Sequence, residues 1–567
     1  MAQQLYFSRD TRMFVQFRNP ADNTEVAAKL GLGAVWEVPI LDGYSFSQTT
    51  NTSEITLAEM ESTAGISRRG RRMFTDSLAP AEFSFSSYVR PFKSKAGSPT
   101  PSGTVSSDSA AETHAVEEVL WASMFGADTY SSNLFTRATN PAVSGGAVIT
   151  PATNSSVIKV SESNRSALTS VTLYFMIDTA TSNPLVYRLP EAVVNDVSID
   201  FDVDGIATLS WTGFAKEVQD VSGNVFTGIS APSDSATTTD GTTIALGDIF
   251  IDTDNAAGRQ FNLVASSAST MGVTAAIDEA TTSTKNFIRN RLTSVSIEAA
   301  TSTDKVSTIF PGQHATISAI DVTNEVVTTS TAHGLTTGDQ VFITGCTGNT
   351  SLNSTHHFVR VGDETGTYAG TTNPTTEFAL FGTKAQAENL GNATGLVAIA
   401  AGSYNTGTGI VANGKYSLTL TGGSFNIANN ITYLVPEELG AINKPLEHVT
   451  GTRTANGNAT CYLTLDDADI TSGTSRQFFN DLVSDGAMGK VVNKFKVTMD
   501  IGGATAATAA SGDPALKIEF PTAHITVPTH QVEDVISLET SFEALPTDFG
   551  TADEITALTY FPVTDYA

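Results

Sequence analysis

The sequence is short of positive charge. Its 567 residues include 31 Lys and Arg against 59 Asp and Glu, which gives a net charge of −28. Proteins that grip nucleic acid use Lys and Arg to neutralise phosphates, so this balance argues against that class. The acidity fits a surface that must not hold DNA, and it equally fits simple solubility or the acidity of a whole proteome.

Cysteine and long apolar runs are also scarce. Cys346 and Cys461 are the two cysteines; they could pair, but we expect reduced core or turn residues in a cytosolic chain. No apolar run approaches the roughly 20 residues of a membrane helix, and the start MAQQLYFSRD lacks the apolar core of a signal peptide. We therefore expect a soluble chain, made in the cytoplasm, with no membrane partner.

The patterns that carry catalysis or bind ligands are missing. No Ser-His-Asp, Cys-His or H-E-x-x-H arrangement is present, and the Gly-rich stretch 31–36 does not lead into a helix as a dinucleotide site requires. The acidic segment 202–205 lacks the other ligands of a calcium loop. His333 and Gly334, in TAHGLTTG, are typical of a turn. We expect no enzyme, no cofactor and no metal site.

What the sequence does contain is β-structure. Hydrophobic residues make up 40% and charged residues 16%, and Ser, Thr, Ala and Gly fill the difference, which suits strands with polar turns. A chain of this length should form three or four domains. Short runs of alternating apolar and polar residues predict many strands. Trp36, Trp121 and Trp211 are expected to anchor the core or an interface.

A similar order of segments occurs twice along the chain. Internal repetition of this kind fixes the architecture and constrains the symmetry of an assembly. The first series is GYSFSQTTNTSEITL, LAPAEFSFSSYVRPF, HAVEEVLWASMFG, LTSVTLYFMID and YRLPEAVVNDVSIDFD; the second is KYSLTLTGGSFNIANNITYL, NGNATCYLTLDD, TSRQFFNDLVSDG, VNKFKVTMDI and IEFPTAHITVPTHQVEDVISLETSF.

One helix is expected in each series. The first spans 110–125, capped by Ser109 or Thr113 and stopped by Gly126. The second spans 475–483, ahead of Gly486. In the first helix an apolar stripe and an outward acidic face follow the helical period. The stripe is Ala115, Val119, Leu120 and Phe125, and the acids expected to face away are Glu112, Glu117 and Glu118.

These segments carry a resemblance to a known family. The stretch YSFSQTTNTSEITLAEMESTAGISRRGRRMFTDSLAPAEFSFSSYVRPF resembles the long hairpin and following strand of phage major tail tube proteins, and RLPEAVVNDVSIDFDVDGIATLSWTGF is also similar to that family. The resemblance implies a β-sandwich with one flanking helix that joins its neighbours edge to edge around an inner barrel. A long loop of the hairpin then reaches the next ring.

The resemblance sets the expected domains. The fold class is mainly β, with two tail-tube-like β-sandwich or barrel domains, each with a flanking helix, and one small inserted β-barrel. The expected limits are 1–220 for the first tube-like domain, 221–284 for a Ser/Thr-rich linker or surface excursion that includes a hairpin, 313–383 for the inserted barrel, which resembles a module of virion proteins, and 285–312 with 384–567 for the second tube-like domain.

Two tube-like domains in one chain imply a stoichiometry. Relatives with a duplicated domain, among the siphophage tube proteins, suggest trimeric rings of pseudo-sixfold symmetry, with six-chain rings as the alternative. The expected product is a structural virion protein of the phage tail, assembled in the host cytoplasm as a conduit for ejection of viral DNA. Its expected partners are further copies of itself, the tape measure protein and DNA in the lumen, and baseplate and terminator proteins at the ends.

Two rival functions remain open at this point. One is a baseplate hub or tail terminator built from paired tube domains. The other is an adhesin or glycan-degrading spike, which needs paired acids and exposed aromatics in a cleft; the 8% aromatic content does not favour it.

Two groups of charged residues are candidate sites. Arg68, Arg69, Arg71 and Arg72 form the strong basic run and are assigned to an inter-ring arm that meets carboxylates; a solvated loop, or contact with DNA, the tape measure or a chaperone, are alternatives. Asp196, Asp200, Asp202 and Asp204 alternate with apolar residues, which places them on one face of a strand. That face is expected to line the lumen, where negative charge repels phosphates, or else to be an outer solvated face.

Overall fold

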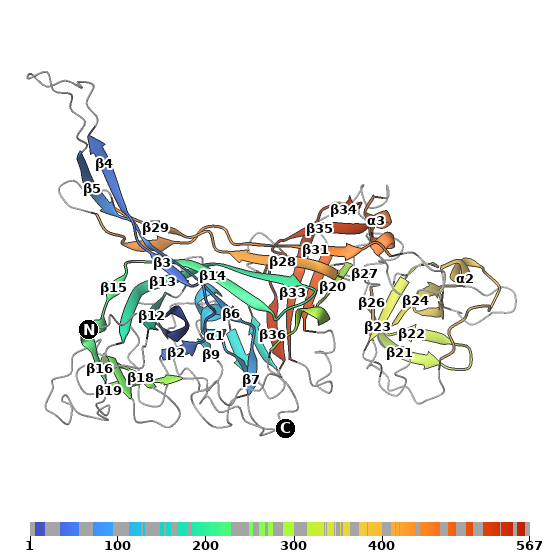
Figure 1. Cartoon of the computed structure of the whole chain (residues 1–567). Coiled ribbons are helices and arrows are strands. Elements are labelled where there is room, and N and C mark those ends of the chain that lie inside the picture. Colours follow the sequence, from blue (N-terminus) through green and yellow to red (C-terminus); the bar gives the residue numbers. More distant parts are fainter. Residues whose placement is uncertain are drawn as a thin grey trace, which may run out of the picture.

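The computed structural model describes the chain in segments. The described residues are 6–17, 35–55, 72–93, 113–125, 129–130, 148–151, 155–159, 168, 170–177, 184–227, 249–252, 260–266, 270–275, 287–299, 315–333, 335, 337–338, 340–344, 346, 352, 355–362, 373–382, 384–399, 410–413, 416–418, 420–436, 443–464, 475–483, 495–502, 514–532, 535–547 and 553–561. Within them the structure is mainly β with several sheets, as the sequence predicts (Figure 1).

The first half of the chain, residues 6–220, forms a twisted antiparallel sheet with a helix against it. Its central pairings are β2–β1–β12–β13 and β13–β14–β6–β3, and β4 pairs with β5 as a separate hairpin. The elements are η1 (Ser8–Asp10), β1 (Thr11–Phe17), β2 (Val35–Val38), β3 (Ser45–Ser47), β4 (Thr50–Ile55), β5 (Arg72–Leu78), β6 (Ala81–Tyr88), β7 (Pro91–Lys93), β8 (Thr113–Ala115), α1 (Glu118–Phe125), β9 (Thr129–Tyr130), β10 (Val148–Pro151), β11 (Ser156–Lys159), β12 (Val171–Ile177), β13 (Leu185–Asp202), β14 (Thr208–Ala215) and β15 (Gln219–Asp220).

The second half, residues 287–299 and 416–561, pairs its strands in the same sequence. Its central pairings are β27–β20–β32–β33 and β33–β35–β31–β28, and β29 pairs with β30 as a hairpin, all antiparallel. The elements are η5 (Asn290–Leu292), β20 (Ser294–Ala299), β27 (Tyr416–Leu418), β28 (Leu420–Ala428), β29 (Thr432–Leu434), β30 (Glu447–Val449), β31 (Thr454–Tyr462), α3 (Ser475–Val483), β32 (Phe495–Ile501), β33 (Ala515–Ile525), β34 (Thr529–Gln531), β35 (Ser537–Ala544) and β36 (Ala557–Phe561).

The agreement between the halves extends to residue register. In the pairing of β6 with β14, Ala81 lies opposite Ala215, and in that of β31 with β35, Ala455 lies opposite Ala544. Both ladders then run for eight pairs and end at a tyrosine, Tyr88 or Tyr462. Counted from these anchors, Ser84 corresponds to Asn458, and their partners are Ser45 of β3 and Ser424 of β28.

Irregularities of the ladders recur at corresponding places. The β12–β13 ladder shifts between Val171 and Leu173, and the β32–β33 ladder shifts between Phe495 and Val497. A single extra residue also interrupts β13 opposite β14, after Val194, and the strand from β33 into β34 opposite β35, after Ile525. Such bulges bend a strand and fix its register, so the two halves share their bends as well as their strand order.

A six-stranded barrel interrupts the second half. Its strands close in the order β21-β22-β25-β24-β23-β26, and Figure 1 shows it beside the second half, away from the first. The closing strand, β26, lies beyond residue 383, the limit expected from sequence. The elements are β21 (Ala315–Asp321), β22 (Val326–Thr329), β23 (Gln340–Thr344), β24 (Thr355–Arg360), β25 (Glu377–Phe381), α2 (Lys384–Glu388) and β26 (Ile410–Asn413).

A turn and a buried arginine hold parts of this barrel. His333 is buried and its Nδ1 accepts the N–H of Leu335 at 2.9 Å, which is the turn role expected for it. Arg360, fully buried, reaches the end of α2 and donates to the carbonyls of Gln386, Ala387, Asn389 and Asn392.

The Ser/Thr-rich segment after residue 220 carries a small sheet. Its elements are η3 (Ser222–Asn224), β16 (Val225–Thr227), β17 (Ile249–Asp252), β18 (Gln260–Ser266) and β19 (Thr270–Ala275). β17, β18 and β19 pair antiparallel, so the expected hairpin is present, and β19 adds parallel to β2. The segment is therefore attached to the sheet of the first half.

The two predicted helices differ in outcome. α3 spans Ser475–Val483 as predicted, and Phe478 and Leu482 face the core. The first helix is shorter than predicted: α1 begins at Glu118, because residues 113–115 form β8 and pair with β7. Thr113 is therefore no cap. Glu117 and Glu118, expected to face solvent, are both fully buried, which corrects the amphipathic reading of this segment.

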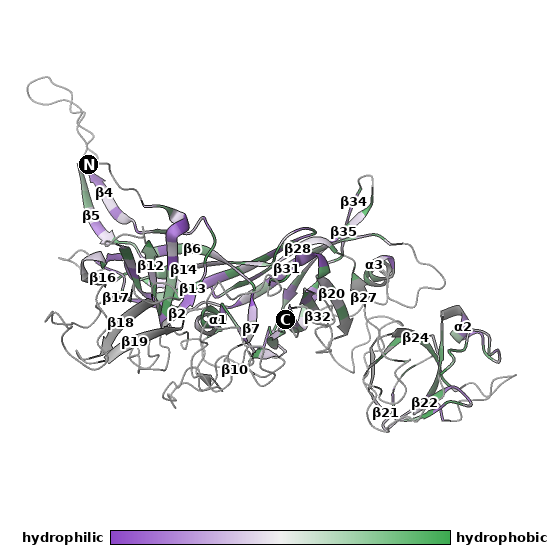
Figure 2. Ribbon diagram, turned by 60° about the horizontal axis from the view of Figure 1, so that its bottom comes forward, coloured by the Kyte–Doolittle hydropathy of each residue, from purple (hydrophilic) through white to green (hydrophobic). Residues whose placement is uncertain are grey.

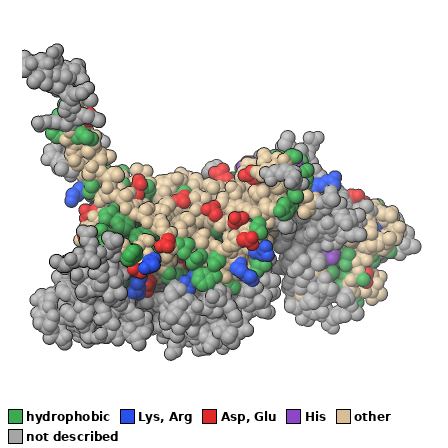
Figure 3. Space-filling model, viewed as in Figure 1, with side chains coloured by type: hydrophobic (Ala, Val, Ile, Leu, Met, Phe, Trp, Pro, Cys, Tyr) green, Lys and Arg blue, Asp and Glu red, His purple; other side chains and the backbone are tan. Residues whose placement is uncertain are grey.

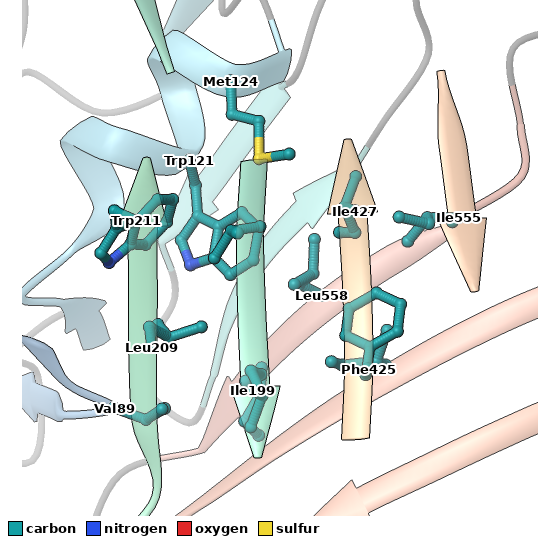
Figure 4. Close-up of a cluster of buried hydrophobic side chains, with 14 of the residues drawn as sticks. Val89, Trp121, Met124, Ile199, Leu209, Trp211, Phe425, Ile427, Ile555 and Leu558 are labelled. Atoms are coloured by element: carbon teal, nitrogen blue, oxygen red, sulfur yellow. The ribbon is translucent and has the colours of Figure 1, made fainter. Parts of the chain in front are cut away.

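The main hydrophobic core is continuous across both halves. Figure 4 shows Trp121 and Trp211 of the first half beside Phe425, Ile427 and Leu558 of the second. Both tryptophans are fully buried, as expected, and their rings meet edge to face at 4.9 Å. The side chain of Trp36 lies outside the described residues.

Two further expectations concern thiols and membranes. Cys346 and Cys461 are both buried and are not joined by a disulfide, which is the reduced core state expected from the sequence. Within the described segments, no helix has the length and apolarity required to traverse a bilayer.

Candidate functional site

The two halves join through their own strands. The C-terminal part of β13 has β14 on one side and β28 on the other, so one sheet runs through both halves in the order β3–β6–β14–β13–β28–β31–β35–β34. We call it the junction sheet and the contact of β13 with β28 the internal seam. The long strands of this sheet cross the middle of Figure 1.

Seven residue pairs form the internal seam, from Asp196 opposite Ala428 to Asp202 opposite Gly422. The bulged residue at its end anchors the next segment: Asn195 accepts the N–H of Asn429 on its carbonyl at 2.8 Å and the N–H of Ile431 on its side-chain oxygen at 2.7 Å. The hairpin β29–β30 thereby lies against the first half, where Ile431 and Tyr433 pack with Val193.

One face of the junction sheet is apolar and buried, and the other is polar. Alternation along each strand produces this division, and Figure 2 shows hydrophilic and hydrophobic residues mixed along these strands. The polar face carries six acids among hydroxyl and amide side chains: Glu82, Asp196, Asp200, Asp202, Glu539 and Glu543, with Ser84, Ser86, Ser198, Thr208, Ser210, Thr212, Ser424, Asn426, Asn456, Asn458, Thr460, Ser537 and Ser541.

None of the polar-face side chains just named is cationic. In the view of Figure 3, acidic side chains are spread over a largely uncharged surface across the middle of the molecule, and the visible Lys and Arg lie toward its margins. Hydrogen bonds link neighbours on the face: Ser86 to Ser210 at 3.1 Å and Asn426 Nδ2 to Asp196 Oδ2 at 2.8 Å. Partial burial raises the pKa of Asp196, and the bond from Asn426 opposes that shift.

The structure places three of the four predicted aspartates together. Asp196, Asp200 and Asp202 share the polar face of β13 with Ser198. Asp204 does not belong to it: β13 ends at Asp202, and Asp204 lies in the turn that follows, strongly exposed and 3.3 Å from Arg291. Gly205, at φ 148, reverses the chain there, so the alternation could not continue to a fourth aspartate.

The predicted basic arm is described only at its base. Arg68, Arg69 and Arg71 lie outside the described residues, and Arg72 begins β5, opposite Ile55 of β4. Figure 1 shows the β4–β5 hairpin projecting from the body of the molecule. At its base, Leu78 donates its N–H to the carbonyl of Asn443 at 2.8 Å, so the second half supports the arm.

Apolar side chains are exposed on this hairpin. Met73 and Phe74 are 58% and 59% exposed, and Ile55 is 40% exposed. The corresponding hairpin of the second half, β29–β30, has strands of three residues, against six in β4 and seven in β5. Large apolar side chains held in water on a projecting hairpin are typical of a contact surface.

A buried polar cluster ties helix α1 to the last strand. Tyr560 of β36 donates its hydroxyl to Glu117 at 2.7 Å and accepts the indole N–H of Trp121 at 2.7 Å. Beside them, His114 and Glu118 are 3.1 Å apart. Burial raises the pKa of Glu117 to about 7, although the bond from Tyr560 and the charge of Arg90 work in the opposite direction.

A known phage protein is similar to part of this chain. No protein-family model matches the chain. The tail tube protein pb6 of Escherichia phage T5 is 33% identical over 142 residues, which are 25% of this chain and 28% of that protein. The chain thus matches little more than a quarter of the relative's length. This match confirms the resemblance to phage tail tube proteins that the hairpin and strand segments indicate.

Proposed function

We propose that the chain is a structural subunit of a phage tail tube, on the premise that it is similar over part of its length to a protein named for that role. In this role it is not an enzyme, and it resides in the virion tail after assembly in the host cytoplasm. The proposal is carried by one observation, the junction sheet, whose two end strands leave the chain open to pairing with further copies.

We propose further that the two halves are duplicated tube domains, with limits near 1–220 and, apart from the inserted barrel and the segment at 221–284, 285–567. The proposal is supported by the matching strand order, registers and bulges. Each half contributes four strands to the junction sheet. Three chains then provide six similar units, and the ring has three-fold symmetry with an approximate six-fold pattern.

In such a ring the polar face lines the lumen. The junction sheet of each chain has eight strands: β3, β6, β14, β13, β28, β31, β35 and β34. The sheets of three chains together make a barrel larger than the roughly 22-stranded barrels that enclose a wide lumen. Asp196, Asp200 and Asp202 then face the channel. Acids and neutral hydroxyls repel or ignore phosphates, so DNA passes without being held; at physiological salt the repulsion reaches about 8 Å.

The arm provides contact between rings in this proposal. Its exposed Met73 and Phe74 would be buried against the next ring, and the basic run Arg68–Arg72 would meet the acidic surface of that ring. Stacking of this kind does not close on itself and therefore builds a tube. The tape measure protein and DNA would occupy the lumen, and baseplate and terminator proteins would cap the ends.

Ring stoichiometry is the first prediction. Three chains of 59.4 kDa should give a ring of about 178 kDa, and end-on cryo-EM views of tubes should have three-fold symmetry. Native mass spectrometry of rings released from tubes measures the mass directly. A six-chain ring would contradict the duplication, and a chain that remains monomeric under assembly conditions would contradict the tube itself.

Charge reversal on the polar face is the second prediction. Asp200→Lys should make assembled tubes retain double-stranded DNA at about 50 mM salt and release it at about 200 mM, because a cation in the lumen binds phosphates by counter-ion release. Asp204→Lys is the matched control, since it makes the same change of charge in the exposed turn off the face. Co-sedimentation of DNA with tubes is the measurement. Equal retention by both variants would contradict the assignment of the face to the lumen.

A further inference from the structure

The internal seam provides a template for the contact between chains. Each half offers its four strands in the same order, β3–β6–β14–β13 and β28–β31–β35–β34. The internal seam joins the last strand of the first series, β13, to the first strand of the second, β28. The strands left over are the first strand of the first half, β3, and the last strand of the second half, β34.

Both leftover strands have an open side. Among the described residues, β3 pairs with β6 only and β34 with β35 only. Pro528 directly precedes β34, a position that suits proline because it has no N–H to donate to a ladder. An open edge of this kind favours pairing with another chain.

The open strands expose what the internal seam buries. By register, His530 corresponds to Ile199, since both lie opposite a leucine, Leu538 or Leu209. Two residues on, Val532 corresponds to Phe201. Val532 is 78% exposed, whereas Phe201 is 4% exposed beneath β28. Burial of exposed apolar side chains stabilises a contact, so this edge would be stabilised by a strand that covers it as β28 covers Phe201.

We infer that residues 529–532 of one chain pair antiparallel with residues 44–47 of a second copy, with His530 opposite Phe46. This inference rests on the proposed tube function and specifies its partner surface. The register is transferred from the internal seam, in which Ile199 lies opposite Phe425 and Asp200 opposite Ser424. Phe425 corresponds to Phe46 and Ser424 to Ser45, through their places opposite β31 and β6.

The pairing also predicts which side chains meet on the polar face. Gln531 lies opposite Ser45 of the second copy, as Asp200 lies opposite Ser424 within one chain. Directly opposite residues in an antiparallel pair have Cα atoms about 4.5 to 5.5 Å apart, within disulfide reach. Diagonal residues, two positions along, are about 7 to 8 Å apart, which is too far. Disulfide formation therefore distinguishes one register from the next.

The experiment uses the full chain with paired cysteines. Ser45→Cys with Gln531→Cys, oxidised after tube assembly, should give covalent dimers and trimers on non-reducing gels and no larger species. Mixing the two single variants should give dimers only, whereas each alone should give none, because the contact joins different surfaces of different chains. The native cysteines should stay silent, since burial raises the pKa of Cys346 and that of Cys461, the latter to about 11.

Two variants control the register. Asp200→Cys with Ser424→Cys should close within one chain and remain a monomer on the gel. Ser45→Cys with Thr529→Cys, the diagonal combination, should form at least about tenfold less cross-link. If tubes assemble but the diagonal combination links preferentially, or neither pair links, the proposed seam is wrong and the tube function stands. If wild-type chains form no rings at all, the tube function itself fails.

Discussion

Arg360→Ala should destabilise the inserted barrel by about 4 kcal/mol, because the substitution removes four charge-assisted hydrogen bonds to backbone carbonyls at once. Arg360 is fully buried, and its guanidinium donates to the carbonyls of Ala387 and Asn392, each at 2.8 Å, and to two others, one in α2 and one in the turn that follows it. Its cationic head also lies 4.0 Å from the ring centre of Phe381. Hydrogen exchange of residues 384–399, followed by mass spectrometry, is the measurement.

Two comparisons sharpen that prediction. Arg291→Ala removes an equally charged but 71% exposed side chain, whose ion pair with Asp204 is in water, and should change stability by less than about 0.5 kcal/mol. Arg360→Lys should fall between the two, since one ammonium group cannot reach all the carbonyls that the planar fork serves. The prediction is wrong if alanine and lysine are equally mild. Tube assembly should survive in each variant, because the barrel takes no part in the junction sheet.

The second large effect concerns pH and Glu117. Its pKa is about 7 in the folded chain against 4.5 for an ordinary glutamate, so the folded state binds a proton that the unfolded state has released between these values. The stabilisation is complete below about pH 4.5 and is lost as pH rises to 7, a change of about 3 kcal/mol. Urea unfolding of unassembled chain, followed by tryptophan fluorescence, is the measurement because Trp121 contacts this cluster.

Glu117→Gln should flatten that profile. The amide oxygen still accepts the hydroxyl of Tyr560, but no charge is buried when pH rises, so the variant should be more stable than the wild type at pH 8. Glu82→Gln, which neutralises an exposed acid on β6, should keep the wild-type slope. A Glu117→Gln chain whose unfolding midpoint still declines between pH 5 and 7 would show that other groups cause the dependence.

Much of the fold can be predicted from the periodicity of apolar residues and from the order of the segments. Alternation in FSFSSY and VSIDFD predicts β6 and the end of β13, and the apolar period of 475–483 predicts α3. These elements follow local rules, because one face is buried and the other is polar along their whole length. The polar face of the junction sheet is therefore readable in part from sequence.

The amphipathic prediction for helix α1 is wrong because its described side chains are all buried. Glu117 and Glu118 follow the helical period that normally marks a solvent face, yet they lie in the core, where Tyr560 bonds one oxygen of Glu117 and His114 lies 3.1 Å from one oxygen of Glu118. Tyr560 is far along the chain, so no residue near 117 indicates that this hydroxyl will contact Glu117. The run VLWASMF that follows the two acids does contain a signal, because it is apolar on nearly every side, which is typical of a buried helix.

The sequence contains a local sign that the aspartate series ends before Asp204, although the alternation of acidic and apolar residues predicts that it continues. Asp204 precedes Gly205, and glycine after an acid commonly marks a turn. Pro528 directly precedes β34 and likewise marks the place where that strand begins, since proline cannot donate to a ladder. The seam itself could not be read from sequence, since the partner of β13 is β28 and only long-range pairing places them together.

The internal seam has a consequence for how a ring comes apart. Because β13 and β28 belong to one chain, their contact forms at an effective concentration set by the connecting chain and not by the amount of protein in solution. In a ring of three chains, translational and rotational entropy would then be lost only when the seams between chains form. Dilution would open those seams alone and release whole chains with the internal seam still closed.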